Sequence, residues 1–157
     1  LLLTFHEECL PPHPKTCIAE SHDAGGTWVL HDGDPSWQGN EGQVIFFLED
    51  STTWLWGSQT NGFWRMTGSG ASVEAIPGMT TSHLQGSQLV HAPDGTFYVA
   101  AADGVWKSPD GKASTWALLP GTGPIQGGLV MDDQTLYTSN CYFGNFCQIN
   151  GNHPKDV

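Results

Sequence analysis

The sequence predicts an all-β protein made of short antiparallel strands joined by tight turns. Of its 157 residues only 13% are charged, whereas glycine (20 residues) and tryptophan (7 residues) are abundant. Glycine supplies turn conformations and aromatic residues favour strands, so this composition is typical of strands rather than helices. No long segment places apolar residues at helical spacing. In addition, one pattern recurs along the chain, and the length fits a single domain with its own core.

The recurring pattern has a period of about 40 residues, the range of a four-stranded propeller blade. Residues 43–78 and 87–121 match over their full length, and residues 127–147 match their first part. The corresponding positions are Asp50-Ser51-Thr52 with Asp94-Gly95-Thr96 and Asp133-Gln134-Thr135, Trp54 with Phe97 and Leu136, Gly62-Phe63-Trp64 with Gly104-Val105-Trp106, and Pro77-Gly78 with Pro120-Gly121.

Each repeat is predicted to form four strands, A to D. The expected ranges are 43–49, 87–92 and 127–131 for strand A; 1–8, 52–58, 96–101 and 135–140 for B; 16–21, 63–66, 105–108 and 145–148 for C; and 27–32, 72–77 and 115–120 for D. Trp54, Trp56, Trp64 and Trp106 are expected in the core.

The sequence therefore predicts one domain of about three and a half propeller blades. It comprises a partial blade at 1–31, blades at 42–78 and 87–121, and a partial blade at 127–157. Propellers close with roughly 4–8 blades, and an open stack exposes apolar blade faces. We therefore expect this to be part of a larger propeller, completed by further chain or by another copy.

The segment SHDAGGTW, residues 21–28, falls between strands C and D of the first repeat. Residues 108–116 are its counterpart, and residues 67–74 occupy the same place in degenerate form. The pattern S-x-D-x-G-x-T-W is complete at Ser21, Asp23, Gly25, Thr27 and Trp28, and approximate at Ser108, Asp110 and Trp116. It resembles the Asp-box, or BNR repeat, of β-propellers.

The Asp-box residues suit a hairpin turn. Aspartate accepts backbone N–H bonds within its own turn, glycine adopts positive φ, and tryptophan buries a large surface between sheets with its N–H near a polar partner. A catalytic role for Ser21-His22-Asp23 is rejected, because a triad needs convergence in space rather than adjacency in sequence. The resemblance implies that these boxes lie away from the ligand-binding face.

Asp-box propellers include sialidases, xyloglucanase-like glycoside hydrolases, sortilin-type receptors, some lectins and photosystem-assembly factors. The resemblance covers nearly the whole chain at the level of fold and implies no specific activity. It places the ligand face at the D–A and B–C connections, opposite the boxes.

The D–A connections at 31–42, 79–86 and 122–127 supply the candidate ligand-binding residues. Each contains an apolar-Gln-Gly triplet, which gives Gln38, Gln85 and Gln126 as candidates for a ring of amides. The alternative is that each glutamine caps neighbouring backbone. In the first and longest connection, Trp37 is a candidate for stacking on a sugar ring, with Asp32 or Asp34 bonding hydroxyls. The alternatives are turn chemistry for the aspartates and gap-filling for Trp37. Two carboxylates are too few for a calcium loop, so neither metal nor cofactor is predicted.

The four cysteines form two close pairs that flank B–C connections. Cys9 and Cys17 make up the first pair, and Cys141 and Cys147 make up the second. Neither pair has the CxxC spacing of zinc sites, so we predict two disulfides and a secreted or extracytoplasmic location. The second loop would present Tyr142 and Phe143 as an aromatic contact surface.

The formal net charge of −11, with only five lysines and arginines, excludes a nucleic-acid partner and disfavours an anionic membrane surface. No stretch approaches the roughly 20 apolar residues of a membrane span. A sialidase needs three arginines for the sialate carboxylate, whereas this chain has only Arg65.

We therefore predict an exported module that binds a glycan or a protein. One alternative is a glycoside hydrolase, whose two carboxylates would be drawn from Asp32, Asp34, Glu41 and Asp103 or lie outside this segment. Another alternative is a scaffold within a larger assembly.

Overall fold

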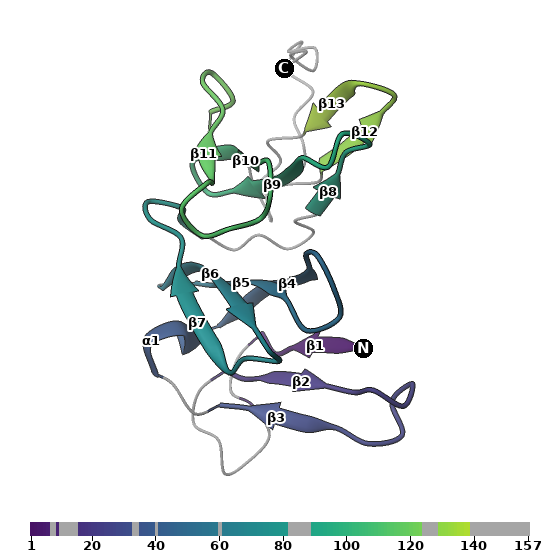
Figure 1. Ribbon diagram of the computed structural model, residues 1–157. Coiled ribbons are helices and arrows are strands. Elements are labelled where there is room, and N and C mark those ends of the chain that lie inside the picture. The colour runs from purple at the N-terminus through teal and green to yellow at the C-terminus, as the bar shows by residue number, and fades with distance from the viewer. Residues whose placement is uncertain are drawn as a thin grey trace, which may run out of the picture. The chain divides into compact units, whose positions relative to one another are not determined.

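A computed structural model describes residues 1–6, 9, 16–32, 35–39, 41–59, 61–81, 89–123 and 129–138 (Figure 1). This part of the chain is all-β, with four antiparallel sheets and one short helix. By its internal contacts the chain divides into two compact units, Leu1–Thr81 and Ser82–Val157.

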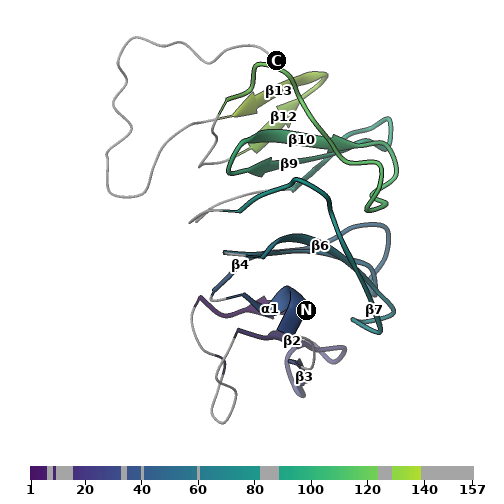
Figure 2. The same cartoon turned by 90° about the vertical axis from the view of Figure 1, so that its left-hand side faces the viewer.

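The first unit contains two antiparallel sheets. The first sheet has the order β1-β2-β3, with β1 at Leu2–Thr4, β2 at Ile18–Glu20 and β3 at Val29–His31. The second has the order β4-β5-β6-β7, with β4 at Gly42–Phe47, β5 at Trp54–Ser58, β6 at Gly62–Thr67 and β7 at Ser72–Ala75. The four-residue helix α1, Pro35–Gln38, connects the two sheets. Two views show the sheets as separate layers (Figure 1 and Figure 2).

The second unit also contains two antiparallel sheets. A four-stranded sheet consists of β8 (Leu89–His91), β9 (Phe97–Ala101), β10 (Gly104–Ser108) and β11 (Ala117–Leu118). A hairpin of β12 (Leu129–Asp132) and β13 (Thr135–Thr138) forms the other.

The all-β class is confirmed, and the strands of each sheet are antiparallel as predicted. Every predicted strand that falls in the described residues overlaps an observed one, although many, such as β2, β3 and β11, are shorter than expected. Helix α1 was not predicted; it occupies part of the first D–A connection. The predicted strand 145–148 lies outside the described residues.

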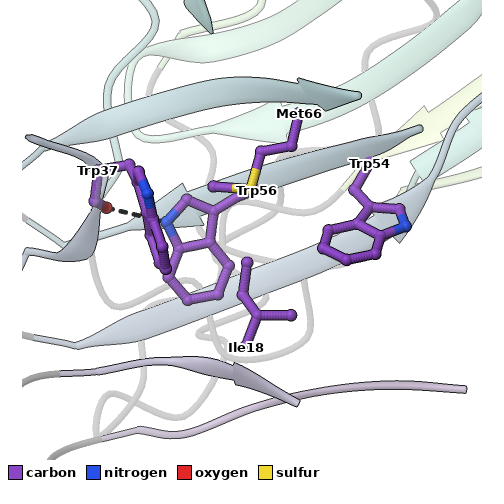
Figure 3. Packing of buried hydrophobic residues seen from close by; sticks show 5 residues of the cluster. All are labelled: Ile18, Trp37, Trp54, Trp56 and Met66. Carbon is purple, nitrogen blue, oxygen red and sulfur yellow. Dashed lines mark hydrogen bonds between the residues drawn. The ribbon is translucent and has the colours of Figure 1, made fainter. Parts of the chain in front are cut away.

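The core of the first unit is built on the tryptophans of β5. Trp54 and Trp56 are fully buried and pack with Ile18 of β2 and Met66 of β6 (Figure 3). Since alternate residues of a strand share a face, Trp54 and Trp56 together turn toward the first sheet. Leu2 of β1 packs against the same cluster from that sheet.

The core of the second unit joins its two sheets in the same manner. Ala100 of β9 and Val105 of β10 pack with Leu129 of β12 and Leu136 of β13, and all four are buried. Adjacent sheets within each unit are therefore held together by apolar residues on facing strands.

Antiparallel topology gives the first unit two distinct ends. The turns at 21–28, 48–53 and 68–71 lie at one end, which we call the turn end. The other end, which we call the loop end, contains Cys9, Cys17, helix α1, Gln59 and Asn61. Figure 1 shows α1 and the β2–β3 turn at opposite ends of the first sheet.

Candidate functional site

Residues 21–28, which resemble an Asp-box and which we call the first box, form a turn closed by their own side chains. Asp23 accepts the backbone N–H of Thr27 at Oδ1 (2.8 Å) and the Thr27 hydroxyl at Oδ2 (2.8 Å). The Ser21 hydroxyl donates to Asp23 (2.9 Å) and accepts the N–H of Gly25 (2.8 Å). Gly25 has a φ of 96°, which a side chain would oppose. The serine and aspartate are therefore engaged in building the turn.

The second box uses the same residue types in the second unit. The Ser108 hydroxyl accepts the N–H of Gly111 (2.8 Å) and lies 2.7 Å from the Thr115 hydroxyl. Thr115 donates that hydroxyl to Asp110 (2.6 Å), and the Lys112 ammonium also donates to Asp110 (2.7 Å). The two boxes therefore share a structural role.

These contacts favour the charged form of both box aspartates. Hydrogen bonds from the backbone and side chain of Thr27 and from Ser21 lower the pKa of Asp23 to about 2. Hydrogen bonds from Lys112 and Thr115 lower the pKa of Asp110 to about 2. A group held this strongly ionised is a poor general acid, in keeping with a structural role.

The two box tryptophans depart from the expectation in opposite ways. Trp28 is 44% exposed, so the prediction that it is buried between sheets was wrong for this residue, although its indole N–H does donate to the Gly25 carbonyl (3.1 Å). Trp116 is buried, yet its indole N–H has no hydrogen-bond partner among the described residues. Each tryptophan meets one half of the predicted pattern.

At the loop end, helix α1 is anchored through its carbonyl groups. The Trp37 carbonyl accepts the indole N–H of Trp56 (2.9 Å) and the hydroxyl of Ser58 (3.0 Å). The Asn61 side chain donates to the Ser36 carbonyl (2.7 Å). Because the last carbonyls of a helix have no intrahelical partner, these donors from β5 and the following turn satisfy them and fix α1 against the second sheet.

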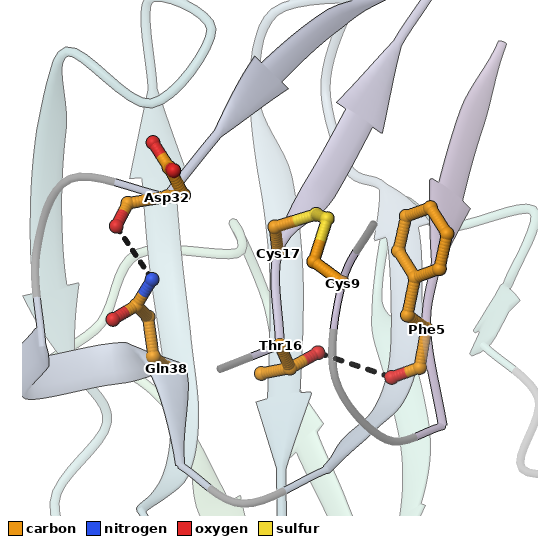
Figure 4. The surroundings of a disulfide bond; sticks show 6 residues. All are labelled: Phe5, Cys9, Thr16, Cys17, Asp32 and Gln38. Atoms are coloured by element: carbon orange, nitrogen blue, oxygen red, sulfur yellow. Dashed lines mark hydrogen bonds between the residues drawn. A yellow bond between two sulfur atoms is a disulfide. The ribbon is translucent and has the colours of Figure 1, made fainter. Parts of the chain in front are cut away.

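Three of the predicted ligand residues of this connection, Asp32, Trp37 and Gln38, are described and lie at the loop end, and each is buried or half-buried. Trp37 is 4% exposed and meets Trp56 edge-to-face, with ring centres 5.6 Å apart, so its ring has no free face for a sugar. The gap-filling alternative describes it better. Gln38 is also buried and donates its amide to the Asp32 carbonyl (Figure 4), so it caps nearby backbone. The half-buried Asp32 remains a candidate contact.

A disulfide lies at the same end of the first unit. Cys9 and Cys17 are bonded and both are buried. Next to them the Thr16 hydroxyl donates to the Phe5 carbonyl (3.0 Å), which ties the start of β2 to the end of β1 (Figure 4). This disulfide was predicted from the cysteine spacing, and it is compatible with an extracellular protein.

The second predicted disulfide, between Cys141 and Cys147, is not confirmed. Both Cys141 and Cys147 lie outside the described residues, so the bond between them stays a prediction. Within the described residues the structure contains only the Cys9–Cys17 disulfide. The remaining predicted site residues also lie outside the described ranges; these are Asp34, Gln85, Gln126, Tyr142 and Phe143.

A buried carboxylate at the turn end was missed by the sequence reasoning. Glu20 of β2 accepts the hydroxyl of Ser69 (2.8 Å) and lies 2.8 Å from His22 Nε2 and 3.1 Å from His31 Nε2. Ser69 belongs to the β6–β7 turn, so Glu20 ties the two sheets of the first unit together. The two histidines near Glu20 in the sequence were the only local sign of this cluster. The contact with Ser69 spans 49 positions, so no local sequence pattern predicts it.

Comparisons with models of known families, with curated proteins and with solved structures gave no match to this chain. Within the described ranges, no group of three or more His, Cys, Asp or Glu side chains is arranged to hold a metal ion. The same part of the chain contains no helix with the length and apolar character needed to cross a bilayer.

Proposed function

We propose that the chain is a segment of an exported Asp-box β-propeller whose loop end binds a glycan or a protein. Two features support the propeller: successive antiparallel sheets follow a repeat of about 40 residues, and the Asp-box turns recur between equivalent strands. The first box occupies the turn end of the first unit, so the loop end of that unit is the available recognition surface.

The observation that carries the binding role is the anchoring of helix α1 and of the Cys9–Cys17 pair at the loop end. Helix α1 is held by donors from Trp56, Ser58 and Asn61, and Cys9 is bonded to Cys17. Binding costs less conformational entropy when contacting groups are held in place beforehand. A binding surface needs only such anchored groups, whereas a glycoside hydrolase needs two carboxylates across a cleft, so the binding role is favoured.

A direct test is a screen of the labelled full chain against a glycan array and an extracellular protein panel, followed by two matched variants. Asn61→Ala removes the side-chain bond to the Ser36 carbonyl (2.7 Å) at the loop end, and Thr52→Ala removes the hydroxyl bond to Asp50 (2.9 Å) at the turn end. Each of these two bonds contributes about 1 kcal/mol to stability.

We expect Asn61→Ala to weaken the selected ligand about fivefold, as loss of about 1 kcal/mol of preorganisation predicts, and Thr52→Ala to leave binding unchanged. Absence of any ligand in both screens would refute the binding role. Hydrolysis of an array glycan would favour a glycoside hydrolase instead.

A further inference from the structure

The first sheet has an apolar face that points away from the second sheet. Leu3 pairs with Ala19, and Ala19 pairs with Leu30, so these three share one face. Leu2 and Ile18 lie on the other face and pack against the second sheet. Leu1 (59% exposed), Leu3 (47%) and Trp28 (44%) leave the outward face uncovered.

The same positions are buried in the next repeats. Strand pairing shows which positions of the repeats are equivalent. Leu3 pairs with Ala19, Trp56 pairs with Trp64, and Val99 pairs with Trp106. Leu3, Trp56 and Val99 therefore occupy the same position in their sheets. By the same register Leu1 corresponds to Trp54 and Phe97, and Trp28 to Trp116. All of these counterparts are buried. Trp54 and Trp56 are buried against the preceding sheet, so the outward face of the first sheet has the character of a surface that receives another sheet.

The β12–β13 hairpin presents the matching half of such a contact. Val130 and Tyr137 are paired in register and are 57% and 39% exposed, whereas Met131 and Leu136 on the opposite face pack within the second unit. Tyr137 occupies the repeat position of Leu2, which in the first unit packs against the following sheet. One chain therefore carries both halves of a sheet-to-sheet contact, and both are exposed.

We propose that the outward face of the β1–β2–β3 sheet binds the outward face of the β12–β13 hairpin in a second copy of this chain. The contact is heterologous, since two different surfaces meet, and each copy keeps one unused half that can continue the association. Exposed apolar side chains at both halves supply the driving force. The inference rests on the repeat register and not on ligand binding at the loop end.

Sedimentation velocity of the full chain over a range of concentrations tests this contact. The wild type is expected to associate, with at least a twofold gain in mass. Leu3→Lys and Tyr137→Lys are each expected to stay monomeric, because each destroys one half. Val29→Lys is the matched control: Val29 is 57% exposed on β3 but lies on the opposite face of the same sheet, so this variant should associate like the wild type.

Mixing the two monomeric variants distinguishes this contact from others. The Leu3→Lys copy retains an intact hairpin and the Tyr137→Lys copy an intact sheet, so the mixture should form a dimer and nothing larger. Circular dichroism and the unfolding temperature confirm that each variant is folded. A monomeric wild type would overturn the proposal and favour another segment as the cover. Association of Tyr137→Lys alone would overturn it in favour of contact between two first sheets, and a monomeric mixture would also overturn it.

Discussion

Gly42 at the start of β4 lies where the two sheets of the first unit are in direct contact. Its N–H donates to the Phe5 carbonyl (3.0 Å), just past the end of β1. A methyl group added at Gly42 would overlap the Thr4 hydroxyl, and it would lie 2.6 Å from Cη2 of Trp56 and 2.8 Å from the Thr16 hydroxyl. We predict that Gly42→Ala forces these neighbours apart.

The expected cost follows from those neighbours. Overpacking a filled core costs about 1–3 kcal/mol. Trp56 is fully buried and held by its bond to Trp37, and moving Thr16 breaks its bond to Phe5, which adds about 1 kcal/mol. The sum is about 3 kcal/mol of unfolding free energy, or a fall of roughly 6–12 °C in Tm for a chain of this size.

Scanning calorimetry and urea unfolding measure this loss. Gly68→Ala is the matched control in the same unit: Gly68 has a φ of +60°, but its nearest contact would be an ordinary one at 3.5 Å from Ala71 Cβ. The control should therefore lose only about 1 kcal/mol, from backbone conformation alone. A Gly42→Ala variant as stable as Gly68→Ala would refute the close approach of the two sheets.

Three further outcomes follow from the turns, the disulfide and the indole groups. The pKa of Asp23 is lowered from 3.8 to about 2, so its contribution to stability is complete above about pH 4 and is lost as the pH falls toward 2. Asp23→Asn should therefore make the acid unfolding curve less steep in that window. An acid unfolding curve unchanged from the wild type would contradict this. Cys9→Ser opens a loop with a sequence separation of 8 and should cost about 2.5 kcal/mol in urea unfolding, so loss of less than about 0.5 kcal/mol would argue that the disulfide adds no constraint. Trp116→Phe removes a buried indole N–H that has no partner among the described residues, whereas Trp56→Phe removes one that is hydrogen-bonded. The Trp116 variant should therefore be the more stable of the two by about 2 kcal/mol. The opposite order in thermal unfolding would count against the hydrogen-bonding states given for the two indole groups.

Local chemistry made the Asp-box turns predictable from sequence. The bonds from Asp23 to Thr27 and from Ser21 to Gly25 each span only four positions, so residue type and spacing nearly determine them. The repeat likewise placed the strands, because hairpin partners follow one another along the chain.

Burial was harder to predict, because it depends on which neighbour covers a face. Trp28 and Trp116 have the same place in the motif, yet one is exposed and the other buried. Trp37 stands in a polar segment with proline and glycine nearby, which favoured an exposed loop residue. In the structure Ser58 and Trp56 donate to its carbonyl, and its side chain is buried. These partners are 21 and 19 positions away, so no local sequence pattern predicts them.

We proposed that the loop end of the first unit, and not its turn end, recognises a ligand. The indole N–H groups report on both ends: that of Trp56 donates to the Trp37 carbonyl at the loop end, and that of Trp28 donates to the Gly25 carbonyl at the turn end. We would titrate the ligand selected by the screen into ¹⁵N-labelled chain and follow both indole signals by NMR. If the ligand binds at the loop end, the Trp56 signal shifts in proportion to binding while the Trp28 signal stays in place. A shift of the Trp28 signal with an unmoved Trp56 signal would instead place the ligand at the turn end.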